Sequence, residues 1–105
     1  MSWTARPQVD ADLIAGRDFI RADNDRAALA FLDTAFEAFD AIGALPRTGA
    51  PARLRHPRLR GLRFLVLPHP FNRWLVFYRL AGRAVVIERV LYGNVNWRQA
   101  PERFF

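Results

Sequence analysis

The sequence contains no cysteine and no lysine. Without cysteine the chain has no disulfide, no thiolate nucleophile and no cysteine-based metal site. Its two histidines, His56 and His69, each precede a proline and lack the spacing of a metal-binding pair. A phosphate-binding glycine loop and a nucleophile elbow are missing too. We therefore expect no metal, no cofactor and no catalytic residue of these common kinds.

Long apolar runs are also missing. Runs such as residues 65–67 and 75–78 are far shorter than the roughly 20 residues that a membrane-spanning helix needs. The first residues have no apolar signal core. With 105 residues, 51% of them hydrophobic and 25% charged, the chain has the size and composition of one globular domain, residues 1–105. We expect a cytoplasmic protein without membrane contact.

All 16 basic residues are arginine, and they are unevenly distributed along the chain. Residues 1–45 hold four arginines and eight acidic residues, a net charge of −4, whereas residues 46–105 hold twelve arginines and two glutamates, a net charge of +10; together they give the net charge of +6. This asymmetry predicts one face suited to polyanions or acidic partners. The alternative is that the arginines only keep exposed strands soluble.

Hydrophobic periodicity predicts two helices after a short strand at residues 2–6. The first helix follows Pro7, with Val9 on its apolar stripe, and fades near Ala22; Asp10 and Asp12 are interpreted as N-terminal capping residues. Residues 23–25 provide a turn and an N-cap for the second helix. The apolar positions of that helix recur at spacings of three and four, at residues 28, 31, 32, 35, 36, 39 and 42, before the stop signals Gly43 and Pro46.

The second half predicts an antiparallel meander. Residues 46–62 form a basic, proline-punctuated connector, and strands follow at 63–67, 73–80 and 84–92, with a tight turn at 81–83. The predicted fold is α+β, namely a strand, a helical hairpin on one face of the sheet and a three-stranded meander. We expect the other sheet face, or an edge strand, to be available to a partner.

Simple alternation in the last strand would place two sets of side chains on opposite faces: Ile87, Arg89 and Leu91 on one, and Val86, Glu88 and Val90 on the other. An arginine among apolar neighbours needs partners. Arg89 is therefore either paired with an acid of the helical half or contacts an anion or a partner. The aromatic residues of the tail, Trp97, Phe104 and Phe105, either close the core over the sheet or contact a target.

Short motifs in a fixed order carry a resemblance to a known family. They are Ala11-Asp12-Leu13, Ile20-Arg21-Ala22-Asp23-Asn24, Ala27-Ala28, Phe31-Leu32, Leu45-Pro46 with Gly49, Leu59-Arg60-Gly61-Leu62-Arg63, Val76-Phe77-Tyr78-Arg79, and Val86 to Gly93 before Trp97. Over nearly its whole length the chain resembles the ParE branch of the RelE/ParE toxin superfamily. The resemblance implies a type II toxin that a cognate antitoxin neutralises in a hetero-oligomer. ParE-like members inhibit DNA gyrase, and RelE-like members cleave mRNA on the ribosome.

The resemblance also suggests site residues. Four are expected to bind the target: Arg60, Arg63, Arg89 and Trp97. Four apolar helix residues are expected to bind the antitoxin: Leu13, Ile20, Phe31 and Phe39.

RelE-like cleavage relies on an arginine entering the sheet, a position matched by Arg63, and on basic residues or tyrosine near the C-terminus. The chain has Asn94-Val95-Asn96 there. The incomplete set favours a gyrase inhibitor that is not an enzyme. The alternatives are a ribosome-dependent mRNA interferase, in which Arg63 and Arg89 would stabilise phosphate charge, and an inactive relative that only binds the antitoxin.

Overall fold

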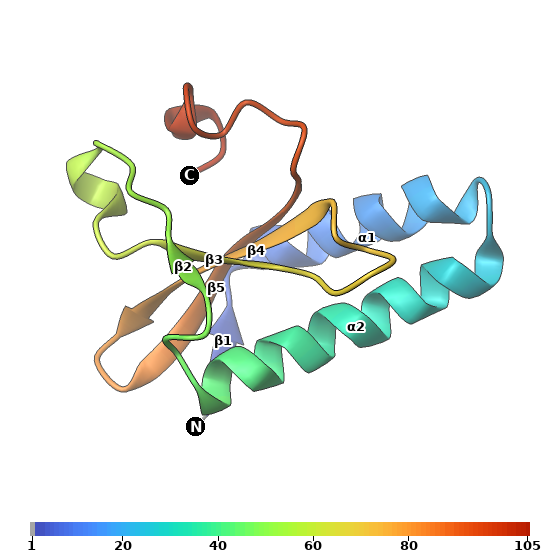
Figure 1. Ribbon diagram of the computed structural model, residues 1–105, viewed down its shortest axis with the longest axis horizontal. Coiled ribbons are helices and arrows are strands. Elements are labelled where there is room, and N and C mark those ends of the chain that lie inside the picture. The colour runs from blue at the N-terminus through green and yellow to red at the C-terminus, as the bar shows by residue number, and fades with distance from the viewer. Residues whose placement is uncertain (1) are drawn as a thin grey trace.

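The structure is a computed structural model that describes residues 2–105. Within these residues it has two α-helices and a five-stranded sheet. The elements are β1 (Trp3–Ala5), α1 (Pro7–Arg21), α2 (Asp25–Ala44), β2 (Ala50–Pro51), β3 (Arg63–Val66), β4 (Trp74–Ala81) and β5 (Ala84–Tyr92), with short 3-10 helices η1 (Pro57–Leu59) and η2 (Pro101–Arg103). The helices form a hairpin whose tip extends beyond the sheet (Figure 1). The predicted α+β class, helical hairpin and late meander are confirmed.

Local sequence signals explain where the helices begin. Pro7 occupies the first turn of α1, where a missing backbone N–H costs no hydrogen bond. Asn24 caps α2, because its Oδ1 accepts a hydrogen bond of 2.9 Å from the backbone N–H of Ala27. Both helices therefore begin within a residue or two of the predicted positions.

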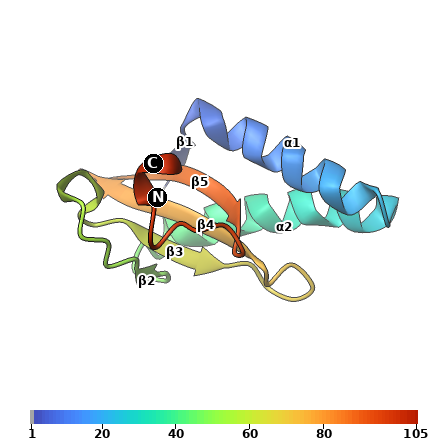
Figure 2. The same cartoon turned by 90° about the horizontal axis from the view of Figure 1, so that it is seen from above.

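The sheet brings the N-terminal strand beside the last one. Its strand order is β1-β5-β4-β3-β2, and β1 pairs with β5 in parallel, with Trp3 opposite Val85 and Ala5 opposite Ile87. The helical hairpin makes this possible, because it returns the chain before the antiparallel meander begins (Figure 2). As a result, Arg6 follows β1 directly beside Glu88 of β5.

A bulge in β5 changes the predicted alternation of side chains. Phe77 pairs with Arg89 and Tyr78 pairs with Ile87, so one residue of β5, Glu88, has no opposite partner. The predicted faces were therefore wrong. Ile87 and Val90 both pack in the helix-side core, whereas Leu91 packs on the opposite face. An extra residue in a bulge shifts the period-2 pattern by one position, which simple alternation does not allow for.

The sheet has a hydrophobic cluster on each face. The helix-side cluster contains Phe31, Phe39 and Tyr78, all fully buried. The other cluster contains Phe77 and Trp97, and it is covered by the segment 52–62 and by the C-terminal tail (Figures 1 and 2). The expectation that the second face lies open was therefore wrong over much of its area, because the tail closes over it.

Candidate functional site

Arg89 of β5 is held by the helical half of the chain. Its Nε and Nη2 donate to the two carboxylate oxygens of Asp12 at 2.8 and 2.7 Å, and its Nη1 donates to the carbonyl oxygen of Phe104 at 2.7 Å. The Asp12 carboxylate also accepts from the backbone N–H of Val90 at 2.9 Å. Such a two-pronged pair is the strongest geometry that Arg and a carboxylate can form. Arg89 thus takes the structural alternative.

The same contacts correct the interpretation of Asp12. Capping was expected, but its side chain is only 7% exposed and points from α1 to the sheet. Asp10 is the acidic residue of the first turn of α1. Asp12 lies further along the helix, where it can reach β5 but not the unpaired N–H groups of the helix start.

Arg63 stabilises the segment that follows α2. Its Nε and Nη2 donate to the carbonyl oxygen of Gly49 at 3.0 and 2.6 Å. The Tyr78 hydroxyl accepts from the backbone N–H of Gly49 at 2.8 Å and donates to the carbonyl oxygen of Pro46 at 2.7 Å. A Cβ on Gly49 would lie 2.5 Å from the carbonyl oxygen of Phe64, so this close approach requires glycine.

The other two predicted target-binding residues have opposite environments. Arg60 is exposed beside Gly61, and its guanidinium has no partner within residues 2–105. Trp97 is only 4% exposed, and its ring centroid lies 5.5 Å from that of Phe64 and 4.9 Å from that of Phe77. Of the two alternatives for the indole of Trp97, core closure matches its burial.

The predicted antitoxin-binding side chains are mostly part of the core. Leu13, Phe31 and Phe39 are buried, and Ile20 is half-buried. The regular apolar stripe of each helix marks the side that packs on the sheet, so the three buried side chains have little surface for a direct contact in this structure, and their role in antitoxin binding stays a prediction. The large apolar helix residues that remain exposed are Ile14, Phe19, Leu29 and Phe36, and of these Phe36 belongs to the predicted stripe of the second helix.

Phe19 borders an apolar groove between α1 and the end of the β4–β5 pair. The groove has a volume of about 290 Å³, and Gly16, Trp74 and Tyr92 also line it. The ring centroid of Phe19 lies 6.0 Å from that of Trp74 and 5.8 Å from that of Tyr92, yet Phe19 is 64% exposed. A groove with such a rim can accept an apolar side chain of a partner.

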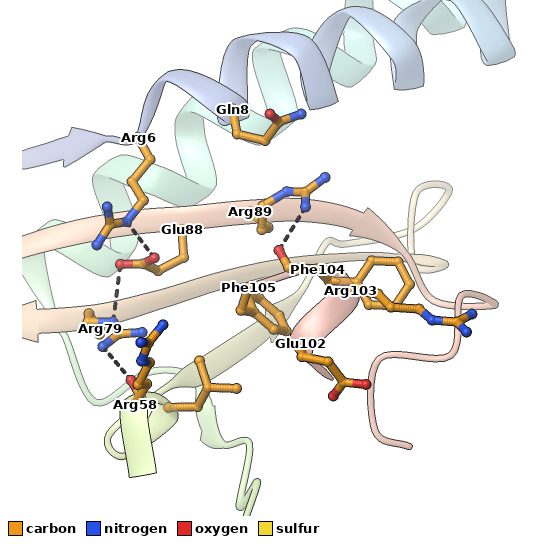
Figure 3. Close-up of a pocket in the computed structure, with 11 residues that line it drawn as sticks. Arg6, Gln8, Arg58, Arg79, Glu88, Arg89, Glu102, Arg103, Phe104 and Phe105 are labelled. Atoms are coloured by element: carbon orange, nitrogen blue, oxygen red, sulfur yellow. Dashed lines mark hydrogen bonds and ion pairs between the residues drawn. The ribbon is translucent and has the colours of Figure 1, made fainter. Parts of the chain in front are cut away.

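A second hollow, of about 560 Å³, is lined by arginine (Figure 3). Glu88 lies in its wall and is 6% exposed. Its Oε1 lies 2.6 Å from Nε of Arg6, and its Oε2 lies 3.1 Å from Nε of Arg79. The contact with Arg79 lacks hydrogen-bond geometry, so Arg79 Nε and Glu88 Oε2 are buried without a hydrogen-bond partner in residues 2–105. Arg79 Nη1 donates to the carbonyl oxygen of Arg58 at 3.0 Å. Sequence analysis missed this cluster, although a lone acid inside a mostly apolar strand of the basic half of the chain was a signal for it.

With the geometry established, comparisons with known proteins identify the family. The family model described as the ParE toxin of the type II toxin–antitoxin system parDE matches residues 4–97. The chain belongs to the ParE toxin family. A solved structure described as the chromosomal ParDE TA system from P. aeruginosa is similar in fold, with 22% sequence identity and a TM-score of 0.69 over 88% of this chain and 95% of that one. No curated protein matches the sequence.

The identification confirms the resemblance on which the site predictions were based. As a ParE toxin of a type II system, the protein has an antitoxin as its partner.

Among residues 2–105 of this toxin, no helix has the length and apolar character to cross a membrane, and no three potential metal ligands cluster. The pKa of Arg73 is raised by its hydrogen bond to the Tyr92 hydroxyl.

Proposed function

We propose that this toxin acts by binding DNA gyrase and not by cleaving RNA. One observation carries the proposal: Arg63 and Arg89, the two arginines that an RNA-cleaving site would use, are both engaged in bonds within the chain. A guanidinium stabilises developing phosphate charge only if its N–H groups can turn to the phosphate. Both of these are instead directed at protein oxygens. Arg60, which is exposed, remains a proposed target contact, and the cytoplasm is the proposed location.

Arg60→Ala should weaken the inhibition of gyrase supercoiling about tenfold, because Arg60 is the proposed target contact and the loss of one arginine contact commonly costs on the order of 1–2 kcal/mol of binding free energy. The measurement is the toxin concentration that gives half-inhibition of plasmid supercoiling. Arg26→Ala on α2 is the matched control, since Arg26 is also exposed, and it should leave inhibition unchanged. If gyrase supercoiled plasmid normally in the presence of the unmodified toxin, and the toxin cleaved ribosome-bound mRNA, the interferase alternative would be favoured and the proposal refuted.

We further propose that the antitoxin inserts an apolar side chain into the groove beside Phe19. The groove is open, mostly apolar, and formed by elements that are far apart in the sequence. A segment that folds on binding can cover such a surface without any change in the toxin's own core. The buried residues Leu13, Phe31 and Phe39 would then contribute indirectly, by holding α1 and α2 in place.

Phe19→Ala should weaken antitoxin binding by about 10- to 100-fold, as expected for an aromatic anchor. The toxin's stability should hardly change, because Phe19 is mostly exposed. Titration calorimetry with the antitoxin measures the affinity. Leu80→Ala provides the control, since Leu80 is an exposed apolar residue in the β4–β5 hairpin. Equal affinities for Phe19→Ala and the unmodified toxin would exclude this groove.

A further inference from the structure

Three hollows with arginine in their lining lie beside the segment 52–60 and the C-terminal tail, and neighbouring hollows share lining residues. The hollow of Figure 3 shares Arg58 with a small one of about 90 Å³, and the small one shares His56 with a third of about 410 Å³. We call the three together the arginine groove. Its arginines are Arg6, Arg53, Arg55, Arg58, Arg79, Arg89, Arg98 and Arg103.

The charge of the arginine groove is poorly compensated. Its acidic lining residues are Glu88 and Glu102, and Asp12 neutralises Arg89 from outside the lining. Eight arginines against these three carboxylates leave an excess of five positive charges. Like charges gathered along one concave surface produce a strong positive potential, which attracts an anion.

Several guanidinium groups of the groove are available to such an anion. Arg55, Arg58 and Arg103 are exposed, and within residues 2–105 their guanidinium groups form no hydrogen bond or ion pair. Arg55 and Arg58 come from one segment, and the tertiary fold brings the C-terminal tail, with Arg103, beside that segment. Figure 3 shows Arg6 and Arg79 on either side of Glu88 with Arg58 beside Arg79, whereas Arg103 lies farther along the lining with its guanidinium directed away from these three.

We propose that the arginine groove binds the phosphate backbone of duplex DNA. The charge extends over three neighbouring hollows, which suits a polymer of phosphates better than a single ion. The nearby aromatic rings are occupied inside the protein: Phe77 packs against Trp97 and Phe105, with ring centroids 4.9 Å apart in each case. Single strands are usually held by stacking on exposed rings. Since loops line most of the groove, contacts to phosphates without sequence readout are expected.

This inference goes beyond the proposed action on gyrase, because DNA binding is a property of the toxin alone. The test is the fluorescence anisotropy of a labelled duplex of about 20 base pairs as toxin is added at several salt concentrations. The groove variant carries Arg55→Ala, Arg58→Ala and Arg103→Ala. The control variant loses the same charge at exposed arginines outside the groove, through Arg26→Ala, Arg47→Ala and Arg83→Ala. Circular dichroism verifies the fold of both.

The groove variant should bind duplex DNA more than about tenfold more weakly than the unmodified toxin, and its salt slope should fall by about 2.7, or roughly 0.9 for each lost phosphate contact. The control variant should lose less than about threefold. A lysine variant that carries Arg55→Lys, Arg58→Lys and Arg103→Lys should preserve binding, because a phosphate contact needs the positive charge. Preserved binding by that lysine variant supports the inference.

Equal losses in the groove and control variants would overturn the inference, because net charge alone would then explain the binding. No binding by the unmodified toxin, or no retention with lysine, would overturn it too. Duplex DNA would be refuted as the ligand if the toxin bound a single strand more tightly than the duplex. It would also be refuted if pyrophosphate, at the same concentration of phosphate groups, displaced the labelled duplex as well as unlabelled duplex DNA does. Gyrase assays on the same variants separate the two proposals, since inhibition that survives the loss of DNA binding leaves the gyrase proposal intact.

Discussion

Asp12→Ala should lower the free energy of unfolding by about 3–5 kcal/mol, the usual cost of removing one partner from a buried ion pair. Arg89 would keep its charge in a site where its side chain is only 19% exposed, and the backbone N–H of Val90 would lose its acceptor. For a domain whose total stability is on the order of 5–15 kcal/mol, this is a large fraction. Urea denaturation followed by circular dichroism measures the change.

Asp10→Ala is the matched control for this change. Asp10 is an exposed acid in the first turn of α1 and forms no hydrogen bond or ion pair with residues 2–105, so its loss should remove only the favourable interaction of a carboxylate with the helix dipole and cost less than about 1 kcal/mol. A double variant, Asp12→Leu with Arg89→Met, should recover much of the lost stability, since an apolar pair leaves no charge buried. If Asp12→Ala proved no more harmful than Asp10→Ala, the ion pair would not be the link between α1 and β5.

Trp97→Ala should also cost about 3–5 kcal/mol and lower the melting temperature by on the order of 10–20 °C. The indole is 4% exposed and packs between Phe64 and Phe77, and the Arg98 guanidinium lies 4.2 Å from its centroid. Truncation would leave a cavity that the sheet cannot collapse to fill. Differential scanning calorimetry measures the shift.

Two control variants separate a core role for Trp97 from a target contact. Trp97→Phe keeps a ring in the site and should lose less than half as much stability as alanine does. Leu45→Ala removes a side chain that is 70% exposed and should change stability by less than about 0.5 kcal/mol. Normal stability of Trp97→Ala together with a loss of gyrase inhibition would contradict core closure and support a direct target contact.

Local patterns predicted the elements well because the interactions that define them are local. The N-cap at Asn24, the proline at the start of α1 and the turn at Gly82, which has a φ of +63°, depend on backbone geometry within a few residues. The functional side chains were predicted less well. Periodicity selects residues such as Phe31 because they are buried, so it finds the core before it finds a binding surface.

The sequence by itself determined the two helices, the meander, the α+β class and the family resemblance, since these follow from spacing, turn residues and motif order. Only the tertiary structure decided which partner each charged side chain meets. Asp12 and Arg89 are 77 residues apart, and Arg6 and Glu88 are 82 apart. Their pairing depends on the parallel addition of β1 to β5 and on the bulge at Glu88. Contacts between distant segments are set by how the layers pack, and residue spacing along one segment carries no information about that packing.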